Sequence, residues 1–443
     1  MPEANDVAVG QAAVRELASL SGRALSLLRQ WVSASPDCGL ARALLTLATC
    51  DSRGDAELRA ELVRAHRDAQ AAGERAVSLV HGVFLFTHRQ YLLAADHLEA
   101  HFGRWPGDEV AALMVDAFSA SGNGVHRARG DVLVERQAAL AGPENWVWTS
   151  QLAWTRAEQG RPEEACELAA RALRHNPRSG LAVHAKAHAE HELGAGSDSA
   201  AFIDRWLAAD PRAVQFRHLN WHAALQCLAA GDFADARRRA DQVLERADVG
   251  MRSATNWRLL LAGQTPARRC ELGHVRELLA APGGTAEVFH TFNLALALAV
   301  EAATDDLNAL ARWAAADERP DFSQVLSPVV QALGYLTAGR PGAAVDLLAR
   351  LGAAVERLGG VRVEREIVQD TLARALADAG EPDRAAALLH HRANSRTRHV
   401  YEDLLITPVP AGRPSRLADV QPRSPVPAGR TEQQPSLKET SHG

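Results

Sequence analysis

The stretch WVWTSQLAWTRAEQGRPEEACELAARALRHNPRSGLAVHAKAHAEHELGAGSDSAAFIDRWLAADP, residues 146–211, decides the fold. It contains two copies of one unit, because the same residue types recur 34 residues apart, the period of a tetratricopeptide helix–turn–helix repeat. The recurring pairs are Ala153 and Ala187, Gly160 and Gly194, and Pro177 and Pro211. Small residues allow two helices to cross closely, and proline ends the second helix. The stretch therefore predicts an all-α repeat array.

The composition is that of a folded protein without a membrane span. Of the 443 residues, 47% are apolar and 23% are charged, and no apolar run has the length of a transmembrane helix. The net charge of -5 and the pI of about 6.4 give no overall attraction for nucleic acid. We therefore expect neither a membrane nor a nucleic acid as partner. Lys186 and Lys438 are the only lysines among the basic residues, which indicates a GC-rich coding bias rather than a function.

The cysteines and the first residues indicate a cytoplasmic protein. The five cysteines are an odd number with wide spacings and no C-x-x-C, so they predict neither a disulfide framework nor a thiolate zinc site. The first residues lack the basic and apolar regions of a secretory signal. We expect the cysteines to be small buried apolar residues.

Helical periodicity continues on both sides of the central stretch. Residues 75–108 fit the same frame, with Gly82 and Ala94 at the small positions, and later hairpins turn at Gly231, Gly339 and Gly380. In every segment with a clear apolar pattern, the apolar residues recur with a period of 3.6 residues. We therefore predict an α-solenoid of degenerate tetratricopeptide-like hairpins.

Composition changes divide this solenoid into segments. The predicted segments are a flexible leader at 1–23, an N-terminal tetratricopeptide-like stack at 24–262, a break at 263–285, a C-terminal helical-repeat stack at 286–406 and a disordered Pro-rich tail at 407–443. The tail holds seven of the 20 prolines and almost no large apolar side chains, so it cannot offset its ordering entropy.

Histidine and tryptophan gather on the helices that should line the concave groove. With repeat position 1 at Gly180, the residues His184, His188 and His191 fall at groove positions 5, 9 and 12. Residues at i, i+4 and i+7 share an arc of about 60° on a helix. The neighbouring repeats add further groove positions, while His222 should turn toward a neighbouring helix. The predicted ligand-binding residues are Ser150, Trp154, Glu158, His184, His188, His191, His218 and Trp221.

The same histidines also have metal-ligand spacing. His184 and His188 lie one helical turn apart, as do His218 and His222 on the next groove helix, and such pairs can share an ion. His191 is roughly 10 Å along the axis from His184, too far for both to bind one ion easily. The alternative to a metal site is that these histidines have a structural role, packed and hydrogen-bonded between helices. The candidate sets are His184, His188, His218 and His222 for metal, His184, His188 and His222 for catalysis, and Glu158, Glu190 and Glu192 as supporting carboxylates.

Four segments resemble the tetratricopeptide repeat protein 38 family. They are AVHAKAHAEHELGA (182–195), FRHLNWHAALQCLAAGDFADA (216–236), VFHTFNLALAL (288–298) and RLGGVRVEREIVQDTLARALADAG (357–380). The resemblance covers roughly residues 25–405 and implies an α-solenoid without a settled biochemical role. Two positions depart from it, since Arg42 stands where relatives tend to carry histidine, and residues 292–296 lack the F-N-D-x-H pattern. The chain therefore looks like a divergent bacterial member that has lost part of any His-rich centre.

Two functions of different classes remain open from the sequence. The first is a cytoplasmic binding or scaffold protein whose groove holds a peptide or a small molecule, with no cofactor. The second is an enzyme of a specialised bacterial pathway that uses the histidines in a closed pocket as acid–base groups or as ligands of a divalent metal. An open groove would favour the first function and an enclosed site the second. The ligand, the reaction and the oligomeric state are not readable from the sequence.

Overall fold

The fold is all-α, as the helical periodicity predicts. The computed structural model describes residues 4–50, 53–120, 122, 124–244, 248–281, 284–393 and 399–407, and no strand occurs among them. The predicted disordered tail lies outside the described residues except for Thr407.

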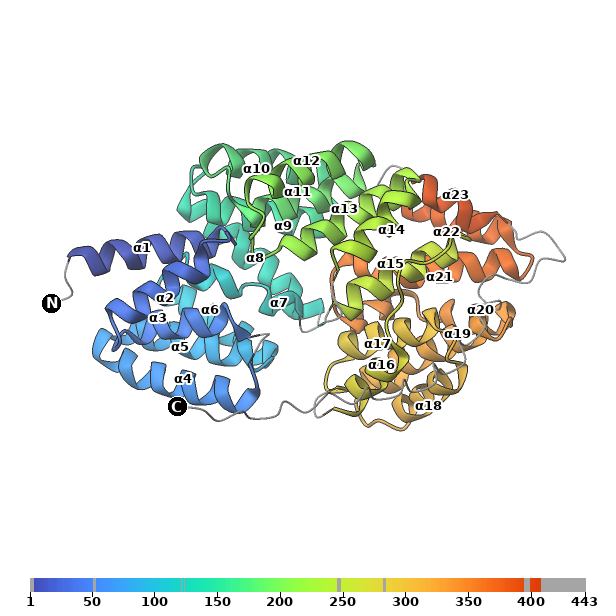
Figure 1. Cartoon of the computed structure of the whole chain (residues 1–443), viewed down its shortest axis with the longest axis horizontal. Helices are drawn as coiled ribbons and strands as arrows, with labels where there is room; N and C mark the ends of the chain where they lie inside the picture. Colours follow the sequence, from blue (N-terminus) through green and yellow to red (C-terminus); the bar gives the residue numbers. More distant parts are fainter. Residues whose placement is uncertain are drawn as a thin grey trace, which may run out of the picture.

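The helices pack mainly against their neighbours in sequence. Those before residue 245 are α1 (Ala4–Ala18), α2 (Ala24–Ala34), α3 (Gly39–Leu47), α4 (Asp55–Ala69), η2 (Gln70–Ala72), α5 (Glu74–Thr87), α6 (Tyr91–Arg104), η3 (Ala111–Met114), α7 (Ala117–Ala120), α8 (Gly124–Ala141), α9 (Trp146–Glu158), α10 (Pro162–His175), α11 (Gly180–Glu192), α12 (Gly196–Ala209), α13 (Phe216–Ala230) and α14 (Phe233–Gln242). Those after it are α15 (Val249–Leu261), α16 (Leu272–Ala280), α17 (Val288–Val300), α18 (Thr304–Ala315), η4 (Phe322–Leu326), α19 (Ser327–Thr337), α20 (Pro341–Leu348), η5 (Gly352–Leu358), α21 (Arg362–Asp378), α22 (Pro382–Ala393) and α23 (Val400–Ile406). The pairs follow one another along a curve from the N-terminal to the C-terminal helices (Figure 1).

The predicted turn and crossing residues occupy the expected places. Gly160 and Gly194 end their helices at φ values of 72° and 71°, a region that glycine enters without a steric penalty. The alanines predicted at helix crossings have no exposed surface, so any larger side chain would need space taken from a neighbouring helix. These alanines are Ala153, Ala187, Ala236 and Ala385.

The N-terminal segment differs from the flexible leader that the sequence predicts. Most of it forms α1, which packs on α2 and buries Ala13 and Leu17. The turn after α1 is tied to the central repeats, since Gly180 N donates to Ser19 O at 2.8 Å and Val214 N donates to Leu20 O at 2.8 Å. These partners lie about 160 and 190 residues away, which is why local composition did not predict an ordered segment.

The apolar core divides at a different place from the predicted break. One cluster of buried apolar residues extends from Ala13 to Trp148 and a second from Val183 to Leu405. The second cluster continues through the Gly- and Pro-rich segment 263–285, where α16 places Val275 in the core. The change of core therefore falls near α9 and α10, and residues 263–285 are an irregular part of one stack.

The C-terminal helices fold back onto the inner helices of the central repeats. Helix α21 packs on α15, and α23 packs on α13. Trp257 Nε1 donates to Thr371 Oγ1 at 2.9 Å, and Arg258 Nη2 donates to the carbonyl of Val363 at 2.6 Å. As a result α13 and α15 are buried on nearly every side, which leaves no open groove along them.

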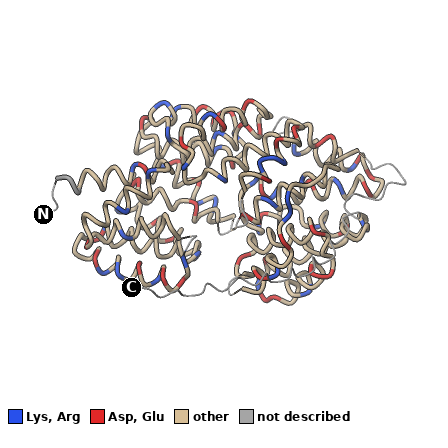
Figure 2. The backbone as a smooth tube through the Cα atoms, in the orientation of Figure 1, with Lys and Arg blue, Asp and Glu red and all other residues tan. Residues whose placement is uncertain are grey.

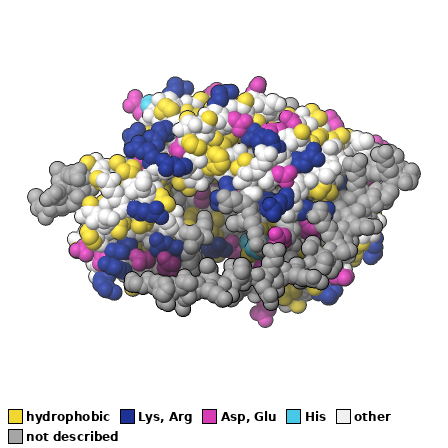
Figure 3. All heavy atoms as spheres, in the orientation of Figure 1, with side chains coloured by type: hydrophobic (Ala, Val, Ile, Leu, Met, Phe, Trp, Pro, Cys, Tyr) yellow, Lys and Arg dark blue, Asp and Glu magenta, His cyan; other side chains and the backbone are white. Residues whose placement is uncertain are grey.

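Charges of both signs are spread along the described helices (Figure 2). On the face drawn in Figure 3, charged side chains of both signs lie among apolar ones. Among the helices of the described residues, none combines the length and the apolar character that crossing a bilayer requires.

The close helix crossings give a test of the repeat register. Replacing Ala187 by Leu should lower the free energy of unfolding by about 1 to 3 kcal/mol, because Ala187 has no exposed surface and extra methylenes overpack the interface. The same change at Ala56, which is exposed on α4, is the matched control. Chemical denaturation of both variants measures the difference. Equal stability of Ala187→Leu and wild type would show that the register is wrong.

Candidate metal centre

Two consecutive inner helices carry the central histidines. His184 and His188 lie on α11, and His218 and His222 lie on α13, each pair one turn apart. Ser179 caps the N-terminus of α11, since its Oγ accepts a hydrogen bond from Ala182 N at 3.2 Å. Since α11 and α13 pack against each other, both pairs face the same space.

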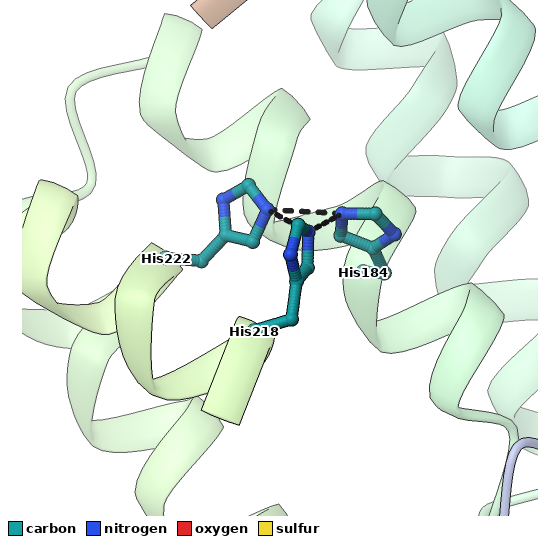
Figure 4. A group of neighbouring side chains, drawn as sticks. All are labelled: His184, His218 and His222. Carbon is teal, nitrogen blue, oxygen red and sulfur yellow. Dashed lines mark hydrogen bonds between the residues drawn. The ribbon is translucent and has the colours of Figure 1, made fainter. Parts of the chain in front are cut away.

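The Nε2 atoms of these histidines converge on one point. His184 Nε2 lies 2.9 Å from His222 Nε2 and 2.9 Å from His218 Nε2, and His218 and His222 are 3.1 Å apart at the same atoms. Figure 4 shows the three rings pointing toward one another from the two helices. The three form a group with metal-ligand geometry among the described residues. His188 Nε2 approaches the group from α11, at 3.2 Å from His184 Nε2.

Hydrogen bonds cannot satisfy this arrangement. Each ring nitrogen of a neutral imidazole carries either one N–H or one lone pair. His184 Nε2 has three other Nε2 atoms within 3.2 Å, so at most one of these contacts is a hydrogen bond. A tetrahedral ion with Zn–N bonds of about 2.0 to 2.1 Å would separate its ligand nitrogens by about 3.3 Å. The observed spacings of 2.9 to 3.2 Å are therefore close to those of ligands around one ion.

Burial keeps the three rings neutral. His184 and His222 are almost fully buried, and His218 is half-buried. Burial, together with the neighbouring imidazoles, lowers the pKa of His184 and of His222 well below the usual value and that of His218 to about 4. Neutral imidazole is the form that binds metal ions, so these rings need not lose a proton to act as ligands near neutral pH.

A buried carboxylate orients His188. Glu158 Oε1 on α9 lies 3.5 Å from His188 Nδ1, which leaves Nε2 of the same ring for the group. Glu158 Oε2 also accepts a hydrogen bond from the backbone N–H of Arg362 at 3.0 Å. Burial alone would raise the pKa of Glu158, but His188 and the Arg362 N–H outweigh burial and lower the pKa. Carboxylate–histidine pairs of this kind fix ring orientation beside metal ions.

Two tryptophans enclose the rings. The Trp154 ring lies 4.6 Å from the His184 ring and 4.4 Å from the His188 ring, between centroids. Trp221 packs on His222 at 5.0 Å and is almost fully buried. These walls lower the local dielectric constant, which strengthens any electrostatic interaction inside.

The remaining predicted residues lie outside the group of rings. The His191 ring packs on the His399 ring, and the His191 carbonyl accepts a hydrogen bond from His399 Nε2 at 2.8 Å. Ser150 is fully buried and donates to the Trp146 carbonyl at 2.7 Å, so it does not line an open groove.

Defined contacts also hold the candidate carboxylates Glu190 and Glu192 and the two positions that depart from the family resemblance. Glu190 pairs with Lys186, and Glu192 Oε2 lies 3.5 Å from Arg362 Nη2. Arg42 bonds to the Pro36 carbonyl at 2.7 Å and to Glu61 at 3.3 Å, in the first hairpin. Phe292 is buried in the second core cluster.

Two residues near the group were missed by sequence reasoning. Glu364 and Arg365, on α21, interact electrostatically with Glu158, and Glu364 also interacts with His188. Burial raises the pKa of Glu364. Both lie about 200 residues from Glu158 and come close because α21 folds back. The segment 357–380 supported the family resemblance, but no spacing linked it to the histidines.

Comparison with known proteins adds little to these contacts. No family model matches the chain, and neither does any curated protein. A solved structure with some similarity is described as the structure of Naa15/Naa10 bound to HypK-THB. The match has 12% identity and a TM-score of 0.20, and it covers 87% of this chain and 68% of that chain. We draw no functional conclusion from similarity at this level.

The contact between His188 and Glu158 gives a test of the site in the metal-free protein. In the presence of a chelator, His188→Ala should lower the free energy of unfolding by about 1 to 3 kcal/mol, because it leaves a buried carboxylate without this partner. In a double-mutant cycle with Glu158→Gln, the coupling should be about 0.5 to 3 kcal/mol. A cycle of Glu158→Gln with His175→Ala, an exposed histidine on α10, is the control and should be additive. Additivity in the first cycle would contradict the pairing.

Proposed function

We propose that this helical-repeat protein binds one divalent transition-metal ion through His184, His218 and His222. The observation that carries the proposal is the convergence of their Nε2 atoms at 2.9 to 3.1 Å, a spacing that hydrogen bonds between neutral rings cannot explain. A ligand set of imidazoles suits Zn²⁺, Cu²⁺, Ni²⁺ and Fe²⁺ rather than Mg²⁺ or Ca²⁺, which prefer oxygen.

The ligand number supports an enzyme rather than a purely structural site. Three histidines leave a fourth position of a tetrahedral ion for water or a substrate oxygen, as in catalytic zinc sites. His188 Nε2 lies 3.2 Å from His184 Nε2, and Glu158 orients its ring. In this proposal His188 is not a ligand and would serve the oxygen bound at the ion. We assign His188 as the group that accepts and returns a proton there, with Glu158 as its positioning residue. The ion would supply Lewis acidity to the bound oxygen.

A peptide groove through the same residues is less well supported. Ser150, His184, His188, His191 and Trp221 are all buried, and the helices of the C-terminal stack cover α13. A helical-repeat architecture suits protein binding, so a scaffold role remains the second candidate, but it would use a surface other than these side chains. The wide spacing and odd number of cysteines keep the cytoplasm as the proposed location.

Metal titration tests the proposed site. Untagged protein stripped with a chelator should gain thermal stability when Zn²⁺ is added, by about 2.7 kcal/mol at a hundredfold excess over the dissociation constant. His184→Ala should lose most of this response, because His184 contacts all three other rings. Glu158→Gln should weaken binding by about 10- to 100-fold. His175→Ala, on the exposed face of α10, is the control and should respond as wild type does.

Two outcomes would contradict the proposal. One is a wild type that shows no stabilisation with Zn²⁺, Ni²⁺, Cu²⁺ or Fe²⁺. The other is an equal response of wild type and His184→Ala. Binding should persist below the usual histidine pKa and weaken only as the pH falls toward the lowered pKa values of these rings, about 4 for His218, because protons then compete for the ligand nitrogens.

A further inference from the structure

A second group of polar side chains lies in the N-terminal repeats, within the other core cluster. It lines a cavity of about 550 Å³ between α4, α5 and α6. Residues at this cavity include His66, Ser78, His81, His97 and His101, and none of them belongs to the central histidine group. The sequence reasoning above singled out none of these residues.

Ser78 begins a relay of hydrogen bonds into the protein interior. Ser78 Oγ on α5 lies 2.9 Å from His101 Nδ1 on α6, and His101 Nε2 lies 3.2 Å from Asp108 Oδ2. An ionised Asp108 can only accept hydrogen bonds, so the proton between the two groups lies on His101 Nε2. The Nδ1 atom of His101 is then free to accept the hydrogen of the Ser78 hydroxyl. The order of groups is hydroxyl, imidazole and carboxylate.

Asp108 is held as an anion in a fixed position. Its side chain is 2% exposed, and Arg75 binds it with two hydrogen bonds, of 2.7 and 2.9 Å. Oδ1 also accepts the backbone N–H of Val110 at 2.9 Å. Burial alone would raise the pKa of Asp108, but the hydrogen bonds of His101 and Arg75 outweigh it and lower the pKa to about 2. The carboxylate can therefore stabilise an imidazolium at His101.

The serine is accessible, whereas its partners are not. Ser78 is half-buried and lines the cavity, while the His101 side chain is 1% exposed. His97 Nε2 donates to the Ser78 carbonyl at 2.8 Å and holds α6 against α5. Burial and the nearby His101 lower the pKa of His97, so it adds no positive charge beside the relay.

We propose that Ser78 is a nucleophile, with His101 as its general base and Asp108 as the residue that orients His101, and that the cavity accepts small uncharged carboxylic esters. Val77 and Trp105 give the cavity apolar walls, and Arg104 and Glu74 at its edge pair with each other. Because these opposite charges cancel at the edge of the cavity, its entrance does not favour a charged ligand. This activity is independent of the metal site.

The reaction balances without a cofactor. The Ser78 proton passes to His101 Nδ1 as Oγ forms a bond to the ester carbonyl carbon, and the carbonyl π pair moves onto oxygen. When that pair returns, the bond to the leaving alkoxide breaks, and the alkoxide takes the proton from His101. Water then attacks the acyl group by the same route, which releases the acid and restores Ser78.

Labelling with a fluorophosphonate tests the assignment on the full-length protein. We expect one label per chain, located on Ser78 by peptide mass spectrometry, and a burst of one nitrophenolate per chain from para-nitrophenyl acetate. Both signals should persist in a chelator. Ser78→Ala should abolish both while the circular dichroism spectrum shows that the protein is still folded, and Ser26→Ala, a change of an exposed serine on α2, should change neither signal.

A second variant tests the proposal even if Ser78→Ala alters folding. Ser78→Cys keeps a nucleophile next to His101 and should be alkylated by iodoacetamide at least tenfold faster than Cys38, a half-buried cysteine outside the cavity. The proposal is wrong if folded wild-type protein takes no label at Ser78, or if Ser78→Ala retains the burst.

Discussion

Four imidazole rings share an enclosed space in which hydrogen bonds between them cannot all form, and this constraint governs the centre of the molecule. His184 Nε2 has three nitrogen neighbours within 3.2 Å but only one hydrogen or lone pair to offer. A cation that accepts several lone pairs at once removes the conflict. The burial of the rings and the placement of Glu158 fit the proposed metal site, because such a site needs neutral imidazoles held in fixed orientations.

The rings are enclosed because the solenoid folds back on itself. In an open array, α11 and α13 would present one face to solvent, whereas here the C-terminal helices cover them. The Arg362 N–H that binds Glu158 lies 204 residues away in sequence. The site therefore depends on α21 folding back onto the central repeats, and changes in α21 should affect the histidines through Glu158.

The sequence predicted the fold better than the site. The 34-residue recurrence of Ala153, Gly160 and Pro177 placed turns and crossings correctly, because these positions depend on local sterics. The spacing of His184, His188, His218 and His222 indicated rings that could share an ion, and their Nε2 atoms lie together, although the repeat frame turned His222 toward a neighbouring helix. The covering of α13 by α23 and the approach of Glu364 were not predicted, because both depend on contacts between distant segments that leave no periodic signal. The order of α1 was missed for the same reason, since its partners lie near Gly180 and Val214.

X-ray absorption at the metal edge of the zinc-loaded protein tests the central claim most directly. The account predicts a first shell of three imidazole nitrogens at about 2.0 to 2.1 Å, with an oxygen as the fourth ligand. It also predicts that His218→Ala removes one nitrogen from this shell, while His175→Ala leaves the spectrum unchanged. A first shell of oxygen or sulfur ligands, or one that His218→Ala does not alter, would contradict the account.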